Sequence, residues 1–305
     1  MISFRYHLVT IAAVFLALAI GLLGGSAFVQ PALQRELENQ TEALRSANDA
    51  LREQIDEVRL EVGGLAAFSE AALPYLAEGK LLGTPAVIVT QVGVEDEVLA
   101  ETQDALAMAG ARVLATVSAS GLLVSEDPEV HVRLAEILGQ PLAAPEDLPG
   151  LAATRLAARL TSPSLAASED DVLTKLLSGG FLAPIGVPPG GATLEEIGAT
   201  GQVVVVLSGG QGEEAVLPPE AFAVPLVEAL TRLGQPVGAG ESLRSDGAYV
   251  SLLRSVGSDT LVTVDDLDQP MGGAALVLGL DRLLSSGVGG NYGVKDGAEP
   301  LPPPP

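Results

Sequence analysis

The segment "SGGQGEE" (208–214) has the composition of a ligand-binding loop. It follows "QVVVVLS" (202–208), an apolar run that predicts a buried strand. Backbone amides of a glycine-rich turn can hold a phosphate group at the start of a helix. This segment, however, has neither the lysine of a P-loop nor the GxGxxG spacing of a dinucleotide site, and two glutamates end it. The sequence therefore favours a plain connecting loop over a phosphate site.

The other groups capable of catalysis form no recognisable constellation. Ser208 would need a histidine base, and the two histidines are His7, beside an apolar stretch, and His131, in a charged helical stretch. Among the paired carboxylates only Asp265-Asp266 follows a predicted strand and could hold a hard cation, although capping a helix is the favoured role of Asp266. We assign no catalytic, cofactor-binding or metal-binding residue, expect no cofactor, and predict that the protein is not an enzyme.

Alternating strands and helices should position these groups. The predicted strands are 85–90, 112–117, 202–208, 236–239 and 260–264, and the predicted helices are 95–109, 129–138, 148–160, 169–177, 219–233, 249–256 and 272–284. The alternation predicts an α/β fold with a doubly wound, mainly parallel sheet of about five strands in Rossmann-like or flavodoxin-like order, with 202–208 at its centre. Ligands of such folds bind beyond the carboxyl ends of the strands, so a site would lie at 90–91, 208–211, 238–242 or 265–266.

Composition excludes several classes of function. The chain has 39 Asp and Glu against 16 Lys and Arg, a formal net charge of -23, which repels a phosphate backbone. We therefore expect no nucleic-acid partner. There is no cysteine, so disulfides, thiolate metal sites and a cysteine nucleophile are excluded.

The N-terminal region contains an apolar segment, residues 8–29, that carries no charge and is long enough as a helix to cross a bilayer. Arg5 precedes the segment, and Arg35 is the first basic residue after it. This bias predicts a single-pass protein of the cell membrane with a cytoplasmic N-terminus and the bulk of the chain outside. A retained anchor is the favoured interpretation, and a signal peptide cleaved after 25–27 is the alternative.

A heptad pattern follows the apolar segment. Its d positions are Leu37, Leu44, Leu51, Val58 and Leu65, and its a positions are Gln34, Thr41, Asn48, Ile55 and Val62. The pattern predicts a parallel coiled coil between two copies of the chain, with Asn48 in the seam fixing the register. Small residues at 13, 17, 21 and 25 would let two membrane helices approach closely. The alternative is a single amphipathic helix lying along its own domain.

These patterns divide the chain into four parts. They are a cytoplasmic start and transmembrane anchor (1–30), a coiled-coil stalk (31–70), an α/β extracytoplasmic domain (80–287) and a flexible tail (288–305). Gly63-Gly64 and the stretch 74–85 are predicted to end the helical pattern. The tail is expected to be extended and mobile, because its glycines and prolines continue neither a helix nor a strand.

The opening "MISFRYHLVTIAAVFLALAIGLLGGS", the coil after it and the closing "GGNYGVKDGAEPLPPP" resemble the actinobacterial copper transport outer membrane protein family. The resemblance implies an envelope protein connected with copper transport or homeostasis, which in this family is thought to form or support a channel in the outer membrane. It also implies copper as cargo and other envelope proteins as partners.

The residues themselves do not add copper chemistry to this resemblance. Copper(I) prefers thiolate or thioether ligands and copper(II) prefers imidazole, whereas the chain has three methionines (Met1, Met108, Met271) and two histidines at spacings that form no ligand set. The expected function is therefore that of a dimeric, non-enzymatic envelope component. The alternative is a ligand-binding or degenerate enzymatic α/β domain with its site at the glycine-rich loop 208–212.

Overall fold

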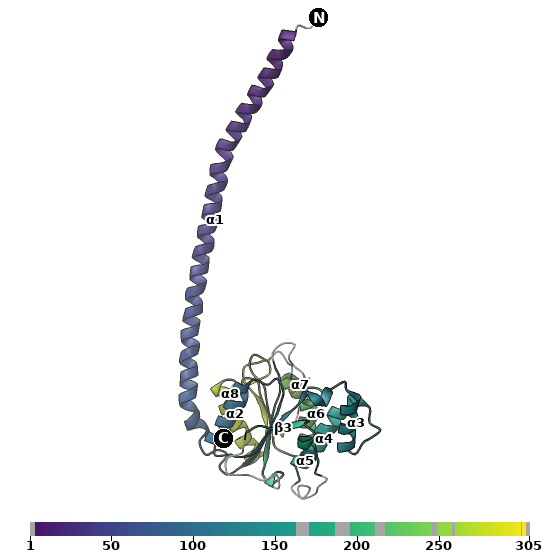
Figure 1. The fold of residues 1–305 in the computed structure, drawn as a ribbon. Coiled ribbons are helices and arrows are strands. Elements are labelled where there is room, and N and C mark those ends of the chain that lie inside the picture. Colours follow the sequence, from purple (N-terminus) through teal and green to yellow (C-terminus); the bar gives the residue numbers. More distant parts are fainter. Residues whose placement is uncertain are drawn as a thin grey trace. The chain divides into compact units, whose positions relative to one another are not determined.

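The computed structural model describes residues 4–162, 171–186, 196–210, 217–245, 249–257, 260–299 and 301–302, with all their side chains except those of 4, 5, 25–36 and 256. The chain divides into two compact units, Met1–Leu65 and Ala66–Pro305. We call the second unit the head. Helix α1, Phe4–Ala77, contains the whole described part of the first unit and supplies the first residues of the head (Figure 1).

Helix α1 continues through residues that were predicted to end it. Gly63 and Gly64 lie inside the helix, so the prediction is wrong for them, whereas the helix does end within the predicted stretch 74–85, at Ala77, after passing Pro74. A glycine costs a helix about 1 kcal/mol and an interior proline about 3 kcal/mol, which neighbouring interactions can offset. Leu73, Ala77 and the following Leu81 are buried in the core of the head, and this burial holds the last turns of α1 in place.

The head is built on a seven-stranded sheet in the order β3-β2-β1-β4-β5-β6-β7. The strands are β1 Pro85–Gln91, β2 Arg112–Ala119, β3 Leu182–Pro184, β4 Val203–Leu207, β5 Val237–Gly240, β6 Leu261–Val264 and β7 Gly290–Tyr292. All neighbouring pairs are parallel except β2 with β3. The predicted α/β class and mainly parallel sheet are confirmed, and the valine-rich β4 lies at the centre as expected.

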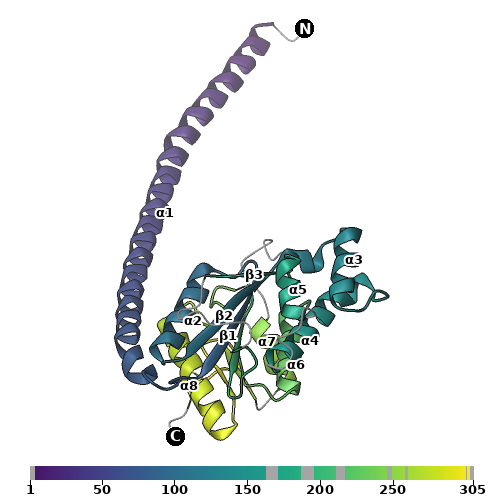
Figure 2. The same cartoon turned by 60° about the horizontal axis from the view of Figure 1, so that its bottom comes forward.

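Helices cover both faces of the sheet (Figures 1 and 2). They are α2 Asp96–Met108, α3 Pro128–Ile137, α4 Leu148–Leu160, α5 Val172–Ser178, α6 Ala223–Arg232, α7 Tyr249–Val256 and α8 Pro270–Ser286, with short 3-10 turns η1 Gly121–Val124 and η2 Pro145–Asp147. The end of α1, α2 and α8 build one apolar core, and α3 to α7 build the other. The predicted helices are confirmed to within a few residues, apart from 169–170, which lie outside the described residues.

Both edge strands were missed by the sequence prediction. β3 has only three residues and ends in Pro184, which an antiparallel edge tolerates because a proline there leaves no ladder donor missing. β7 begins at Gly290, inside the segment expected to be a flexible tail that continues no element. That expectation is wrong for 290–299: β7 pairs with β6, Tyr292 is buried, and Glu299 pairs with Asn291 and Gly293 through backbone hydrogen bonds.

A buried ion pair anchors the helical layer on the face of α3 to α7. Arg159 of α4 donates from Nε to the Asp171 carboxylate at 2.6 Å and from a terminal nitrogen to the Ile197 carbonyl oxygen at 3.1 Å. Both side chains of the ion pair are 1% exposed. Asp171 also caps α5 by accepting from the Thr174 amide. The pair therefore joins two helices and the connection that leads into β4.

Candidate functional site

A row of four polar side chains crosses the carboxyl edge of the sheet. Strand register places Gln91 beside Ser208, Ser208 beside Glu241 and Glu241 beside Asp265, at the carboxyl ends of β1, β4, β5 and β6. Neighbouring residues of a parallel ladder point to the same face of the sheet, so the four side chains form one line. Each is at most 3% exposed. We call Gln91, Ser208, Glu241 and Asp265 the polar row.

At one end of the row, Asp265 is enclosed by partners from its own chain. Arg254 of α7 approaches its carboxylate to 2.7 Å, and the amides of Val294 and Lys295 donate to the same oxygens. Gly293 lies so close to Asp265 that a Cβ there would come within 2.2 Å of Oδ1, and its φ of +124° favours glycine. The segment after β7 is therefore shaped around this carboxylate.

The next member, Glu241, is neutralised by the same segment. Lys295 donates from Nζ to Glu241 at 2.9 Å and to the carbonyl oxygens of Ser242 and Ser245 at 3.2 and 3.4 Å. Burial raises the pKa of Glu241, and the ammonium group of Lys295 opposes this increase. The Lys295 ammonium thus lies at the carboxyl ends of β5 and β6 and neutralises this part of the row.

The other half of the row lies between β1 and β4, where the order of the strands reverses. Ser208 donates from its hydroxyl to the Gln91 side-chain oxygen. The Nε2 of Gln91 has no hydrogen-bond partner among the described residues, and neither has the Thr90 hydroxyl, which points to the opposite face. Gly209 and Gly210 follow directly, and a Cβ at 210 would lie 2.8 Å from the Gly93 carbonyl oxygen. Gln211 and Gly212 of the loop singled out in the sequence lie outside the described residues.

Asp266 does not have either of the roles considered for it. The N-cap of α8 is Gln269, so Asp266 does not cap this helix. Its neighbour Asp265 is held by Arg254 and by amides, and no group of acidic or histidine side chains among the described residues could hold a metal ion. Asp266 is buried with Oδ1 unpaired, and burial, with the nearby Asp265 and Asp268, raises its pKa to about 6.

Ser208 and His131 have separate hydrogen-bond partners in the described geometry. His131 of α3 is hydrogen-bonded to the Ser125 carbonyl oxygen, whereas Ser208 is hydrogen-bonded to Gln91. Met108 and Met271 lie in different helices, α2 and α8. The row therefore offers hydrogen bonding and buried charge, and the described residues give it neither an activated nucleophile nor a soft metal-ligand set.

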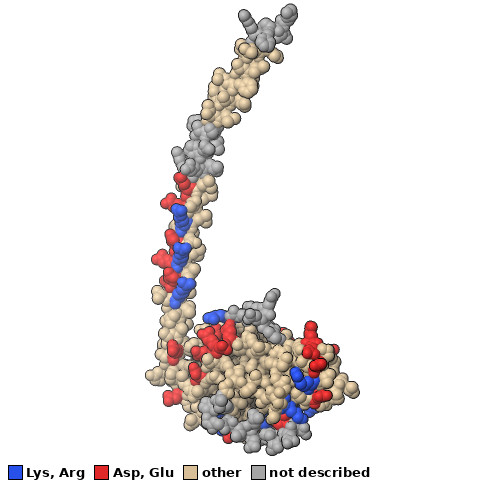
Figure 3. Space-filling model, in the orientation of Figure 1, with Lys and Arg blue, Asp and Glu red and all other residues tan. Residues whose placement is uncertain are grey.

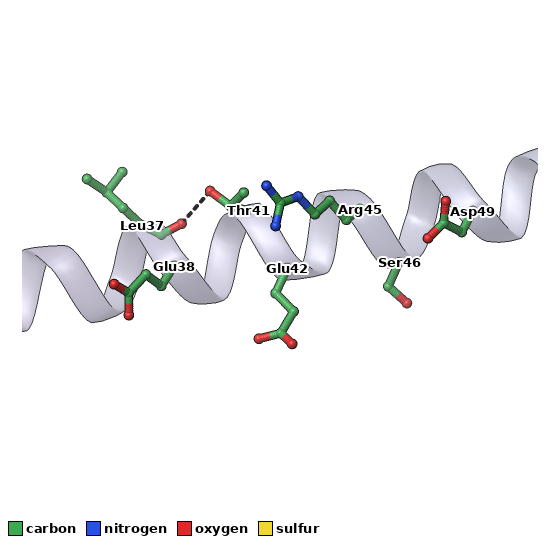
Figure 4. Close-up of a pocket in the computed structure, with 7 residues that line it drawn as sticks. All are labelled: Leu37, Glu38, Thr41, Glu42, Arg45, Ser46 and Asp49. Atoms are coloured by element: carbon green, nitrogen blue, oxygen red, sulfur yellow. Dashed lines mark hydrogen bonds between the residues drawn. The ribbon is translucent and has the colours of Figure 1, made fainter.

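A shallow hollow outside the head is lined by one helix alone. Its residues are Leu37, Glu38, Thr41, Glu42, Arg45, Ser46 and Asp49, all from α1 (Figure 4). Thr41 donates from its hydroxyl to the Leu37 carbonyl oxygen at 2.7 Å. Because a single helix cannot enclose a small molecule, this hollow is not an enclosed ligand pocket.

The sequence pointed to all four strand ends, but it did not reveal the two cations that neutralise the carboxylates there. Arg254 and Lys295 are distant in sequence from Asp265 and Glu241, respectively, and Lys295 lies in a segment whose composition suggested a flexible tail. One signal could have found the row itself: polar residues directly follow the four strand cores, at 90–91, 208, 241–242 and 265–266.

Together these features define a protein with one N-terminal apolar helix and an α/β head whose strand-end charges are neutralised by its own C-terminal segment. The family model described as "Copper transport outer membrane protein, MctB" matches residues 1–303, so the chain belongs to this family. It is 28% identical to "Copper transporter MctB" of Mycobacterium tuberculosis (strain H37Rv) over 319 residues, 98% of each chain. It is 27% identical to the protein of the same name from Mycobacterium leprae over 326 residues, the whole of each chain.

Replacing Lys295 should destabilise the head. A Lys295→Met variant leaves Glu241 buried without its counter-charge, and we expect its free energy of unfolding near neutral pH to fall by about 3–5 kcal/mol. Urea denaturation of the full chain in detergent measures this change.

Two further variants test the cause. The double variant Lys295→Met/Glu241→Gln should recover most of the loss, because it buries no unpaired charge. Lys80→Met, which removes a half-exposed pair with Asp281, should cost less than about 1 kcal/mol. Equal losses in the two lysine variants would contradict the role given to Lys295.

The stability of the protein should depend on Asp266 between about pH 4 and pH 7. Its pKa is raised from 3.8 to about 6 on folding, so the folded state favours the protonated form, and its contribution is lost as the pH rises through about 6. We expect Asp266→Asn to be more stable than the wild type by up to about 3 kcal/mol near neutral pH, with no difference below about pH 4. Unfolding free energies of both proteins, measured across this pH range, test the prediction. A difference between wild type and variant that does not change with pH would contradict it.

Proposed function

We propose that the chain is a membrane-anchored envelope protein that takes part in copper transport as a parallel homodimer, with a non-enzymatic head. The observation that carries the proposal is a line of exposed apolar side chains at heptad spacing along α1, in the same helix as a segment able to span a membrane. We base the proposed role in copper transport on the description of the family to which the chain belongs.

The membrane anchor is supported by the start of α1. Tyr6–Gly24 is long and apolar enough to cross a membrane, and none of its described side chains is buried. Nineteen residues rise about 28 Å as a helix, close to the thickness of a hydrocarbon layer. We propose that this helix is retained in the cell membrane, with the N-terminus cytoplasmic and the head outside. The family description leaves the outer membrane as the alternative location.

The dimer is supported by the exposed seam. Leu44 is 71% exposed, Leu51 57% and Ile55 49%, and the other a and d side chains described between Leu37 and Leu65 are exposed as well. Figure 3 shows charged side chains along one side of this part of the helix and uncharged ones beside them. Large apolar side chains at heptad spacing are stabilised by a second helix, and Asn48 in the seam favours two strands in fixed register.

The charges beside the seam favour the parallel orientation. Arg45, Arg52 and Arg59 occupy successive e positions and are exposed. In a parallel pair each e position faces a g position of the partner, here the uncharged residues 40, 47 and 54. In an antiparallel pair the e positions would face each other, and the arginines would repel. A parallel coiled coil also agrees with two N-terminal helices anchored in the same membrane.

The head supports a non-enzymatic role in copper transport. Its described residues contain no group of three or more His, Cys, Asp or Glu side chains that could hold a metal ion, and the strand-end carboxylates Asp265 and Glu241 are already paired with Arg254 and Lys295. We therefore propose that copper passes through other envelope proteins, which the dimer organises. Nucleic acid is not proposed as a partner because of the strongly negative charge.

A charge in the seam should separate the two copies. We expect Leu51→Asp to give a monomer at micromolar concentration, because it places a carboxylate in the apolar interface. Leu60→Asp is the matched control, since Leu60 is an exposed leucine on the same helix outside the a and d positions. Sedimentation equilibrium of the full chain in detergent measures the mass, and a dimeric Leu51→Asp variant would disprove the seam.

The Leu51→Asp and Leu60→Asp variants also test the proposed role in copper transport in cells. In a strain that lacks the protein, wild type and Leu60→Asp should restore the cellular copper content, whereas Leu51→Asp should leave it at the level of the deletion strain. No change of copper content on deletion would refute the role in copper transport.

The anchor can be tested by mass spectrometry of the purified membrane fraction. A retained helix predicts an intact chain that still contains residues 6–24, extractable by detergent but not by alkali. A chain that begins after Ala27 and is found in the soluble fraction would show that the segment is a cleaved signal.

A further inference from the structure

The two halves of the polar row differ in how their hydrogen bonds are satisfied. Glu241 and Asp265 receive theirs from Arg254 and from the segment 293–295. That segment gives no described hydrogen bond to Gln91 or Ser208. The Nε2 of Gln91, in a residue 3% exposed, has no partner among the described residues. A buried donor left without a partner costs about 1–3 kcal/mol, so native structures rarely retain one without water or a ligand.

The unpaired donor lies where ligands of this fold class bind. β1 and β4 flank the reversal of strand order, and the crevice at the carboxyl ends of such a strand pair is the usual ligand position. Backbone surrounds this position, because Gly209 and Gly210 bring the loop after β4 against Gly93 and Ser245. Gly209 has a φ of +95° and leaves no room for a Cβ, which would lie 2.4 Å from the Ser245 hydroxyl. Any side chain at 209 would change this arrangement.

We propose that Gln91 and Ser208 bind a small, uncharged molecule that carries hydroxyl groups, such as a polyol or sugar. The Ser208 hydroxyl uses its proton on the Gln91 side-chain oxygen and keeps lone pairs to accept a further bond, whereas Gln91 offers an N–H. A ligand hydroxyl satisfies both, because it accepts and donates. If the oxygen and nitrogen of the Gln91 side-chain amide exchange places, the nitrogen donates to Ser208 and the oxygen is left unpaired. A ligand hydroxyl can then donate to this oxygen, so the same class of ligand still fits.

Charge excludes the phosphate ligand that a glycine-rich loop suggests. The cation nearest to this half of the row is Lys295, and its ammonium is already paired with Glu241 and bonded to the Ser242 and Ser245 carbonyl oxygens. Arg244, in the loop after β5, faces Glu97 at 3.9 Å, where both side chains are exposed. A phosphate or carboxylate would therefore find, among the described residues, no buried cation that is not already paired with a carboxylate.

The matched control is the second buried glutamine of the sheet. Gln202 is 1% exposed and uses both ends of its side chain, accepting from the Gly198 amide and donating to the Leu160 carbonyl oxygen. Gln202→Met should therefore lower the free energy of unfolding more than Gln91→Met. It should leave ligand binding unchanged, because Gln202 precedes β4 at the opposite edge of the sheet.

Saturation-transfer NMR on the full chain, in a detergent without a sugar headgroup, tests the site. We use glycerol, glucose and inorganic phosphate, each at about 10 mM, a concentration that detects millimolar affinities. We expect signals from glycerol or glucose, at least about tenfold weaker binding in Gln91→Met and in Ser208→Ala, and unchanged binding in Gln202→Met and in the monomeric Leu51→Asp variant.

Three outcomes would overturn the proposal. Absence of a signal from both neutral probes would mean that ordered water alone satisfies Gln91. A signal from glycerol or glucose that persists in Gln91→Met would show that the neutral probe binds elsewhere. A phosphate signal that is present in the wild type and lost in Gln91→Met would show that this is an anion site. The NMR readout depends neither on the dimer nor on copper. Failure of the ligand proposal therefore leaves the proposed envelope function intact, and failure of the proposed envelope function leaves the ligand proposal intact.

Discussion

Register between neighbouring parallel strands determines what the head presents at its carboxyl edge. One polar side chain of the row ends β1, another directly follows each of β4, β5 and β6, and the ladder aligns these side chains. A shift of one residue in any strand would turn its polar side chain to the other face and put an apolar one into the row. The register therefore buries two carboxylates at this edge of the sheet, and these need cations as partners.

This requirement explains why the C-terminal segment belongs to the head. Lys295 and the amides at 294–295 reach the row only because β7 adds a strand beside β6 and the chain then turns at Gly293. Arg254 strengthens the attachment by donating to the Tyr292 carbonyl oxygen at 2.9 Å. The glycines that suggest a flexible tail are thus needed for close approach to Asp265.

Much of the architecture could be predicted because it depends on local patterns. Valine runs identify β1 and β4, and the period of apolar residues identifies helices such as α4, whose predicted bounds 148–160 are those observed. β3 and β7 could not be predicted, since three-residue edge strands with proline or glycine acquire their conformation from pairing with β2 and β6. The pairing of Glu241 with Lys295 spans more than fifty residues, and no local pattern contains it.

The late position of Lys295 also has a consequence for synthesis. Glu241 has its ammonium partner only after residue 295 has left the ribosome, so until then a structure that buries this carboxylate is penalised by an uncompensated charge. A nascent chain is therefore kept from completing its head until β7 and the segment after it have been made. Under the proposed topology, with the head outside the membrane, this delay would keep the polypeptide unfolded for threading through a translocation pore.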